Sequence, residues 1–258
     1  MVYNESNPHF WEDVMGNTLA KNRIWEIDFL RGLLIPGMIM IHLIYDVVDL
    51  YGFIHWPYPQ WYSLFKNNYG ALFVALSGLS VTLGRRSIRR GIQVLLGGMC
   101  CTIVTVGMYF IGMAGKGIII YFGVLHCLGV CMILWPLFRK CPGWALAVFG
   151  VVLVAAGWHL RDRVYFDLPV LLPLGFQFYG FASSDYFPLM PNFGYFLLGA
   201  AAGRKLYAEK RSLWPDGPAG NPIVRFFSLC GRHSLGIYLA HQPVLAAMCE
   251  LIVLLRKM

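Results

Sequence analysis

The sequence predicts an all-α membrane protein, a polytopic bundle of about seven transmembrane helices with a cytoplasmic N-terminus. Of its 258 residues, 58% are hydrophobic and only 13% are charged, whereas a typical soluble domain has roughly 25% charged residues. The mean hydropathy is +0.59. A transmembrane helix needs about 20 apolar residues, so about seven spans with short loops fit into this length. The same numbers exclude a disordered chain, a collagenous fibre and a secreted disulfide scaffold.

The apolar segments divide the chain into residues 1–26, which we expect to form a cytoplasmic segment, and residues 27–258, which we expect to form a single transmembrane domain. Residues 1–26 lack the basic stretch and apolar core of a cleaved signal peptide. Each expected span is close to membrane length and has no charge cluster at its centre. The spans are 27–50, 68–84, 91–113, 118–138, 143–160, 186–203 and 234–255.

The net charge of +8 indicates topology rather than nucleic-acid binding, because membrane proteins carry Lys and Arg in their cytoplasmic loops. With the N-terminus inside, the cytoplasmic segments hold about twice as many Lys and Arg residues as the outer segments. We therefore expect the N-terminus inside the cell membrane, the C-terminus outside and no nucleic-acid partner.

The first span carries several polar residues, which are costly in a bilayer and persist where they pair or act. Arg23, Asp28 and Arg31 mark its cytoplasmic end, and His42 and Asp46 lie towards the outer end. Spacings of three and four place Asp28 with Arg31, and His42 with Asp46, on one helix face. The first pair is either an ion pair that anchors the helix or part of a ligand site. The second is either a helix-packing contact or a general base whose imidazole the carboxylate orients.

A run of arginines follows the second span in the sequence RRSIRR. These side chains either set topology and bind anionic lipid or clamp the phosphates of a nucleotide-like donor, since guanidinium groups match phosphate geometry. The run comprises Arg85, Arg86, Arg89 and Arg90.

Histidines recur in two later spans, His126 in the fourth and His241 in the last. At a rise of 1.5 Å per residue, His42 lies about 21 Å from the inner surface and His126 about 12 Å from the outer start of its span. The two could therefore share a layer. His126 and His241 are each either satisfied core histidines or substrate-binding residues.

The segment 164–182 is apolar enough to span but contains Asp167 and two prolines. An eighth span here would place the most basic loop outside, so we expect an outer re-entrant or interfacial segment. Asp185 and Tyr186 then lie among aromatic rings, which is typical of an interfacial belt or of a site for a sugar or small polyol. Further on, the small residues 199–203 predict close helix packing.

The seven cysteines lie in or beside the apolar spans and show no CxxC or His/Cys ligand spacing. We interpret them as small core residues and expect no metal site.

Five sequence motifs together resemble the heparan-alpha-glucosaminide N-acetyltransferase catalytic-domain family, in its short bacterial branch. They are RIWEIDFLRGLLIPGMIMIHLIYD, FVALSGLSVTLGRR, YFGVLHCLGV, SSDYFPLMPNFGYFLLGAAAG and GRHSLGIYLAHQPV, in this order along nearly the whole chain. The first and last motifs are also similar to those of the wider acyltransferase-three superfamily.

This resemblance implies a transmembrane acyltransferase that uses cytoplasmic acetyl-CoA or another acyl-CoA as donor. It implies a hydroxyl or amine of a glycan-like or small acceptor at the outer side. In the family the catalytic histidine follows the first helix, at the position that corresponds here to His55, whereas the in-helix histidine of the superfamily corresponds to His42. We rank His42 first and His55 second.

Our sequence-based hypothesis is therefore an acyltransferase in which His42, aided by Asp46, deprotonates the acceptor. Arg31 and the arginine run would hold the donor phosphates near the inner face. The expected partners are membrane lipid, acyl-CoA and the acceptor, with a homodimer left open. A proton-coupled small-solute transporter, in which intramembrane His and Asp relay protons, is the alternative.

Overall fold

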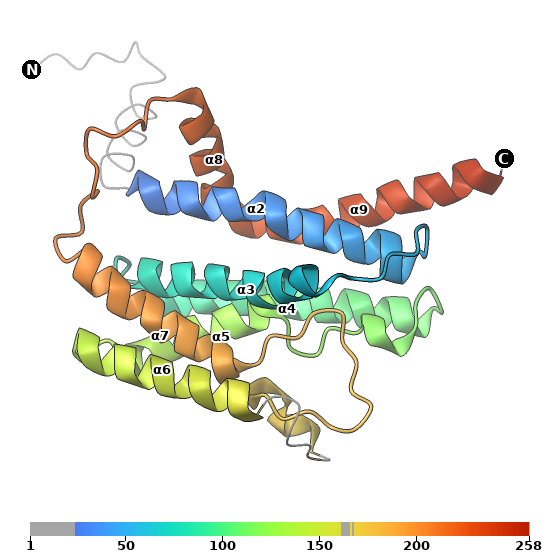
Figure 1. Ribbon diagram of the computed structural model, residues 1–258, viewed down its shortest axis with the longest axis horizontal. Coiled ribbons are helices and arrows are strands. Elements are labelled where there is room, and N and C mark those ends of the chain that lie inside the picture. Colours follow the sequence, from blue (N-terminus) through green and yellow to red (C-terminus); the bar gives the residue numbers. More distant parts are fainter. Residues whose placement is uncertain (1–23, 161–165, 167, 258) are drawn as a thin grey trace, which may run out of the picture.

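The computed structural model describes residues 24–160, 166 and 168–257, and this part of the chain is all-α (Figure 1). The first long helix, α2, continues as a π-helix over Asp46–Leu50, and short 3-10 helices cover Lys116–Ile118 and Pro169–Leu174. The long helices are α2 (Trp25–Tyr45), α3 (Gln60–Val81), α4 (Ser87–Phe110), α5 (Val124–Phe138), α6 (Gly143–Leu160), α7 (Leu189–Leu206), α8 (Pro222–Arg232) and α9 (Ser234–Lys257). The predicted all-α fold class is confirmed.

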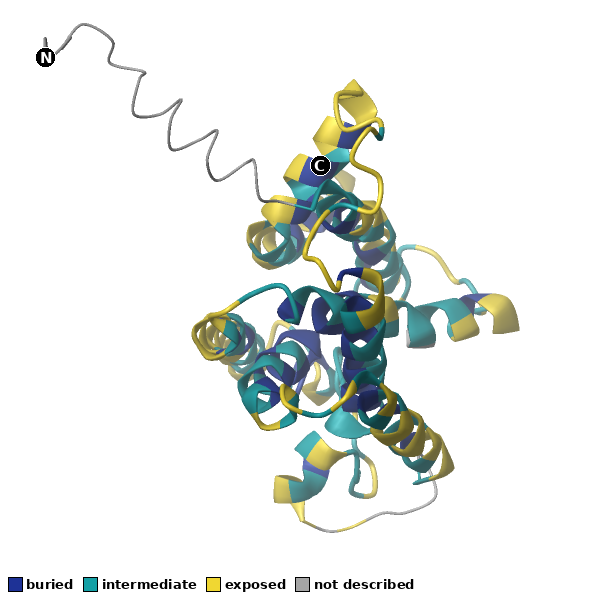
Figure 2. Ribbon diagram, turned by 90° about the vertical axis from the view of Figure 1, so that its left-hand side faces the viewer, coloured by how far each residue is buried: buried dark blue, intermediate teal, exposed yellow. Residues whose placement is uncertain are grey.

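Four of the described helices are long and apolar enough to cross a membrane. They are α2 with its π-helical extension, α4, α6 and α9. The apolar helix α5 is shorter. Figure 2 shows exposed residues along the outer faces of the bundle. The exposed residues include large apolar side chains such as Ile103, Val151 and Leu254. Soluble monomers seldom expose such continuous apolar surface, so this surface is that of an integral membrane protein.

The helices run back and forth along the long axis of the molecule, whereas α8 stands across the end of α2 (Figure 1). The connections α3–α4, α5–α6 and α7–α8 gather at one end of the bundle, which carries the arginine run and which we call the basic end. The connections α2–α3, α4–α5 and α6–α7 lie at the opposite end.

Several helix bounds differ from the expected spans. The second helix begins at Gln60 rather than at residue 68, and the fourth begins at Val124 rather than at residue 118. Within the segment 164–182, the only helix among the described residues is the 3-10 helix Pro169–Leu174. That helix is too short to cross a bilayer. Most of the expected segment 1–26, including Arg23, lies outside the described residues.

Small residues allow the helices to pack closely. A Cβ atom on Gly199 of α7 would lie 1.9 Å from the carbonyl oxygen of Ala75 in α3, and one on Gly78 of α3 would lie 1.9 Å from that of Phe196 in α7. The run 199–203 thus packs as its small residues predict, because only hydrogen in place of a side chain lets the backbones approach so closely. The contact lies beside the buried core around Phe196 and Leu197.

Candidate active site

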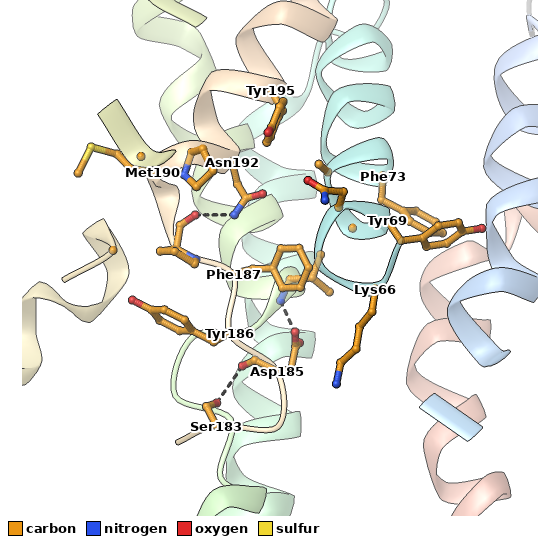
Figure 3. Close-up of a pocket in the computed structure, with 18 of the residues that line it drawn as sticks. Lys66, Tyr69, Phe73, Ser183, Asp185, Tyr186, Phe187, Met190, Asn192 and Tyr195 are labelled. Carbon is orange, nitrogen blue, oxygen red and sulfur yellow. Dashed lines mark hydrogen bonds between the residues drawn. The ribbon is translucent and has the colours of Figure 1, made fainter. Parts of the chain in front are cut away.

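A cavity of about 360 Å³ opens among α2, α3, α5, α7 and the segment that precedes α7 (Figure 3). We call it the histidine cavity, because His42 lines it. Its walls combine aromatic rings with polar side chains, as small-molecule sites commonly do. The polar lining residues include His42, Lys66, Asn68, Tyr69, Ser183, Asp185, Tyr186, Asn192, Tyr195 and Tyr238.

His42 reaches the cavity from the last turn of α2 and is half-buried. Its ring lies edge-on to two rings of α9, with centroid distances of 4.8 Å to His241 and 6.4 Å to Tyr238. Within the described residues no side chain or backbone group forms a hydrogen bond with the imidazole of His42. Its ring nitrogens are therefore available to a ligand.

Asp46 lies one turn beyond His42 but is fully buried and does not line the cavity. Its two carboxyl oxygens accept hydrogen bonds from Nε2 of Gln242, at 2.9 and 3.0 Å. The contact joins the end of α2 to α9. The structure thus places Asp46 against Gln242 rather than against the His42 imidazole.

Asp185 is held in the cavity wall by the contact of two loops at the end opposite the basic end. Phe187 donates its backbone N–H to the carbonyl oxygen of Phe122 at 2.8 Å, and the Ser183 hydroxyl donates to that of Ile119 at 2.8 Å. These bonds fix the backbone on either side of Asp185.

The Asp185 carboxylate then caps α5. Its Oδ2 accepts a hydrogen bond from the backbone N–H of Val124 at 3.0 Å and a longer one from the Tyr238 hydroxyl at 3.4 Å. Burial is the main cause that raises the pKa of Asp185 to about 6, although these two hydrogen bonds act in the opposite direction. A carboxyl group with this pKa can exchange a proton near neutral pH.

Other side chains of the cavity are fixed by hydrogen bonds to the backbone. Tyr186 donates its hydroxyl to Leu172 at 2.8 Å, and Tyr69 donates to Leu34 at 2.9 Å. Burial raises the pKa of Tyr186 above its ordinary value, so this phenol stays protonated. The rings therefore form rigid walls.

His126 does not line the cavity and is buried. Its Nδ1 accepts a hydrogen bond from the backbone N–H of Gly123 at 3.2 Å, so the proton lies on Nε2, which is 3.3 Å from the Thr102 hydroxyl. Both nitrogens are thus used in capping α5 and in joining it to α4. Between the two interpretations of His126, this geometry favours a satisfied core histidine.

A second cavity, of about 280 Å³, lies nearer the basic end, and we call it the basic-end cavity. Arg31, Arg90, Ser77 and Gln93 are among its lining residues. Three further lining residues, Phe73, Leu128 and Tyr238, also line the histidine cavity. The two cavities therefore adjoin across these side chains.

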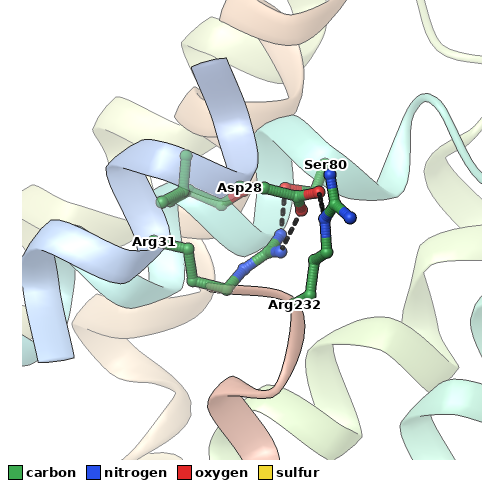
Figure 4. Close-up of polar contacts among 5 residues, drawn as sticks. Asp28, Arg31, Ser80 and Arg232 are labelled. Carbon is green, nitrogen blue, oxygen red and sulfur yellow. Dashed lines mark hydrogen bonds and ion pairs between the residues drawn. The ribbon is translucent and has the colours of Figure 1, made fainter. Parts of the chain in front are cut away.

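Arg31, which lines the basic-end cavity, belongs to a network of charged groups (Figure 4). Its guanidinium donates to Oδ1 of Asp28 at 3.3 Å and to the Ser80 hydroxyl at 2.8 Å. Asp28 also pairs with Arg232 at 3.5 Å. Asp28 thus orients Arg31 and ties α2 to the junction between α8 and α9.

The rest of the arginine run lies on a groove at the basic end, lined by Arg85, Arg86, Arg89 and Arg139. This groove shares Gly84, Ser87 and Gln93 with the basic-end cavity. Groove, basic-end cavity and histidine cavity consequently follow one another along the bundle.

The remaining predicted residues lie away from the histidine cavity. His55 is exposed in the connection between α2 and α3, and His241 lies behind His42 rather than in the cavity wall. Within the described residues, no group of three or more His, Cys, Asp or Glu side chains is placed to hold a metal ion.

Sequence reasoning missed Lys66 and Tyr238. Lys66 lines the histidine cavity, with its ammonium 5.4 Å from the ring centroid of Tyr58 and 5.8 Å from that of Tyr45. The expected second span begins at residue 68 and therefore leaves Lys66 in the preceding loop. Tyr238 could have been found from its spacing of three from His241, which places both on one face of α9.

Comparison with known proteins gives one informative match. A family model described as "Heparan-alpha-glucosaminide N-acetyltransferase, catalytic" matches residues 23–243, which is most of the chain. Comparison with curated proteins and with solved structures gives no match.

Proposed function

Because the chain belongs to the heparan-alpha-glucosaminide N-acetyltransferase catalytic family of membrane acetyltransferases, we propose that it transfers an acetyl group across the bundle. The donor is acyl-CoA bound at the basic end, and the acceptor is a hydroxyl or amine of a glycan-like or small molecule in the histidine cavity. One observation carries the proposal. A cavity lined by arginines adjoins a cavity lined by a histidine whose imidazole forms no hydrogen bond with any described residue.

The residues at the basic end fit a donor with phosphates and amides. Arg31 and Arg90 supply guanidinium groups, which pair with phosphate oxygens. The Ser77 hydroxyl lines the same cavity and is buried without a hydrogen-bond partner among the described residues. Such an orphaned group is satisfied by a polar ligand.

The distance between the two ends suits an extended donor. Arg31 and His42 are eleven residues apart on α2, which corresponds to about 16 Å along the helix axis. The pantetheine arm of coenzyme A is long enough to bridge this distance. No carrier has to move within the bundle.

His42 acts as general base in this mechanism. Bound acetyl-CoA supplies an activated thioester, whose C–S bond breaks as the acceptor nitrogen or oxygen forms its bond to the acyl carbon. His42 takes the proton that the acceptor loses and returns it to the departing thiolate sulfur. The products are the acetylated acceptor and free coenzyme A, and the enzyme regains its neutral histidine.

The sidedness follows from the charges. The positive-inside rule favours the basic end as the cytoplasmic end, so the N-terminus is inside and the histidine cavity lies towards the outside. Asp185 and the rigid aromatic walls supply the hydrogen-bonding and stacking groups that a sugar-like acceptor requires. The outward apolar surface contacts membrane lipid.

The proposal is tested with the purified protein in lipid nanodiscs, acetyl-CoA and a panel of amino sugars and sugar alcohols. We expect acetyl transfer to at least one acceptor and a loss of about 10²- to 10⁴-fold in His42→Ala. His233→Ala, at an exposed histidine outside both cavities, is the matched control. Unchanged turnover in His42→Ala would refute the assignment of the base.

A proton-coupled transporter is not favoured by the family match. Thermal unfolding with added coenzyme A distinguishes the two functions. A protein that binds coenzyme A in its folded state is stabilised according to mass action, whereas a transporter of another solute is not.

A further inference from the structure

His241 of α9 has a defined protonation state in the structure. Its Nδ1 lies 2.6 Å from the backbone carbonyl oxygen of Tyr238. A carbonyl oxygen only accepts hydrogen bonds, so Nδ1 carries the proton of the neutral imidazole. Its Nε2 is then a hydrogen-bond acceptor with a free lone pair.

This acceptor atom is buried and has no partner among the described residues. His241 is 8% exposed, and its Nε2 is among the buried atoms without a hydrogen bond. Leaving a buried polar atom unpaired destabilises the folded state, so such an atom in a native structure calls for a functional explanation.

The aromatic group nearest to His241 is the imidazole of His42, at a centroid distance of 4.8 Å. Two imidazoles joined by an N–H···N bond have centroids about 5 Å apart, from an N···N distance of about 2.9 Å and about 1.1 Å from each nitrogen to its ring centre. The observed separation therefore suits such a bond after a rotation of the ring planes, which now stand at 65°.

Other candidates for orienting His42 are already engaged. Asp46 receives both hydrogen bonds from Gln242, and the Asp185 carboxylate caps α5. Lys66 and the Tyr238 hydroxyl also lie near His42, but an ammonium carries no lone pair and the Tyr238 hydroxyl donates to Asp185.

We propose that His241 is the positioning residue of the active site: its Nε2 accepts a hydrogen bond from His42 and thereby fixes the tautomer and orientation of the base. The carbonyl of Tyr238 holds His241, and His241 holds His42, so the second nitrogen of His42 is left unprotonated for the acceptor. The inference rests on the proposed function for its catalytic consequence but not for the pairing itself. It gives to a second histidine the orienting role that a carboxylate has in other catalytic sites.

Two substitutions separate packing from hydrogen bonding. His241→Phe keeps a planar ring against His42 and removes the acceptor nitrogen, whereas His241→Gln keeps an acceptor oxygen without the ring. His233→Phe makes the same chemical change at an exposed position near the start of α9 and serves as the control. Thermal unfolding in nanodiscs verifies that each variant is folded.

The pairing is measured by the ¹⁵N chemical shifts of ring-labelled histidine, with the His42 signals assigned from their loss in His42→Asn. We expect a single tautomer of His42 in the unaltered protein and in His241→Gln, and a mixture of tautomers in His241→Phe. An unchanged His42 tautomer in a folded His241→Phe protein would overturn the proposal. This measurement needs no acceptor, so it decides the pairing even if no acetyl transfer occurs.

The kinetic consequence is measured with acetyl-CoA and the acceptor found in the panel. We expect His241→Phe to lower kcat about tenfold or more with an unchanged KM for acetyl-CoA, and His241→Gln to recover part of that loss. A fully active His241→Phe, or a His241→Gln as inactive as His241→Phe, would contradict the positioning role. Absence of transfer by the unaltered protein would instead contradict the proposed function.

Discussion

Replacing Gly123 by alanine tests how Asp185 is held in the cavity wall. A Cβ atom at this position would lie 2.2 Å from Oδ2 and 2.8 Å from Cγ of Asp185. Since Cβ atoms essentially never approach closer than 3.0 Å, the carboxylate must retreat by at least about 0.8 Å. A retreat in line with the hydrogen bond to Val124, which is 3.0 Å long, would stretch it beyond bonding distance.

The loss of this helix cap determines how far the unfolding midpoint should fall. A side-chain cap contributes about 1 kcal/mol, which lowers the unfolding midpoint of a protein of this size by about 2–4 °C. Thermal unfolding of Gly123→Ala in nanodiscs measures the loss. Gly117→Ala is the control, because its Cβ would meet only Ala182 at an ordinary 3.8 Å. Equal midpoints for the two variants would refute the argument that Asp185 occupies the space beside Gly123.

Three further predictions concern stability. Because burial raises the pKa of Asp185 from 3.8 to about 6, its contribution to the free energy of unfolding is fully present below pH 3.8 and is lost as the pH rises through about 6. Asp185→Asn should therefore reduce the pH dependence of the unfolding midpoint between pH 4 and 7, and an undiminished dependence would exclude this assignment. Gln242→Leu leaves the buried carboxyl group of Asp46 without its two hydrogen bonds and should lower the free energy of unfolding by about 1–3 kcal/mol, as measured by denaturant unfolding. Adding Asp46→Leu should recover part of this lost stability. Gly199→Ala forces α7 away from α3 and should lower the free energy of unfolding by about 1–3 kcal/mol. The control is Gly107→Ala, whose Cβ would meet no atom within 4 Å and which should be neutral or stabilising by up to about 1 kcal/mol. Equal unfolding midpoints for the two variants would contradict the packing argument.

The fold class could be predicted because a bilayer requires long apolar helices, and composition alone reports these. The bounds could be predicted less well where polar side chains enter the bundle. The second span is expected to begin at residue 68, beyond Lys66, yet the helix begins at Gln60. It includes Lys66 and Asn68, whose side chains line the cavity. Hydropathy does not distinguish a side chain that lines a cavity from one that faces lipid.

The sequence predicts contacts of the candidate site only between residues that are close together in one helix. His42 was identified because it lies in an apolar span, and the structure places it on the cavity wall. The partner of Asp46 could not be predicted, because Gln242 lies 196 residues further along the chain. Asp46 and His42 share a helix face, but the tertiary contact with α9 decides which group the carboxylate binds.

Tyr238 is one wall of both cavities, and this shared wall has a thermodynamic consequence. If a ligand on one side displaces the ring, the space on the other side changes as well. Binding energies are then coupled, and the donor must alter the affinity for the acceptor by the same factor by which the acceptor alters the affinity for the donor. Donor affinities measured with and without acceptor, in the unaltered protein and in Tyr238→Ala, would give the strength of this coupling between the two cavities.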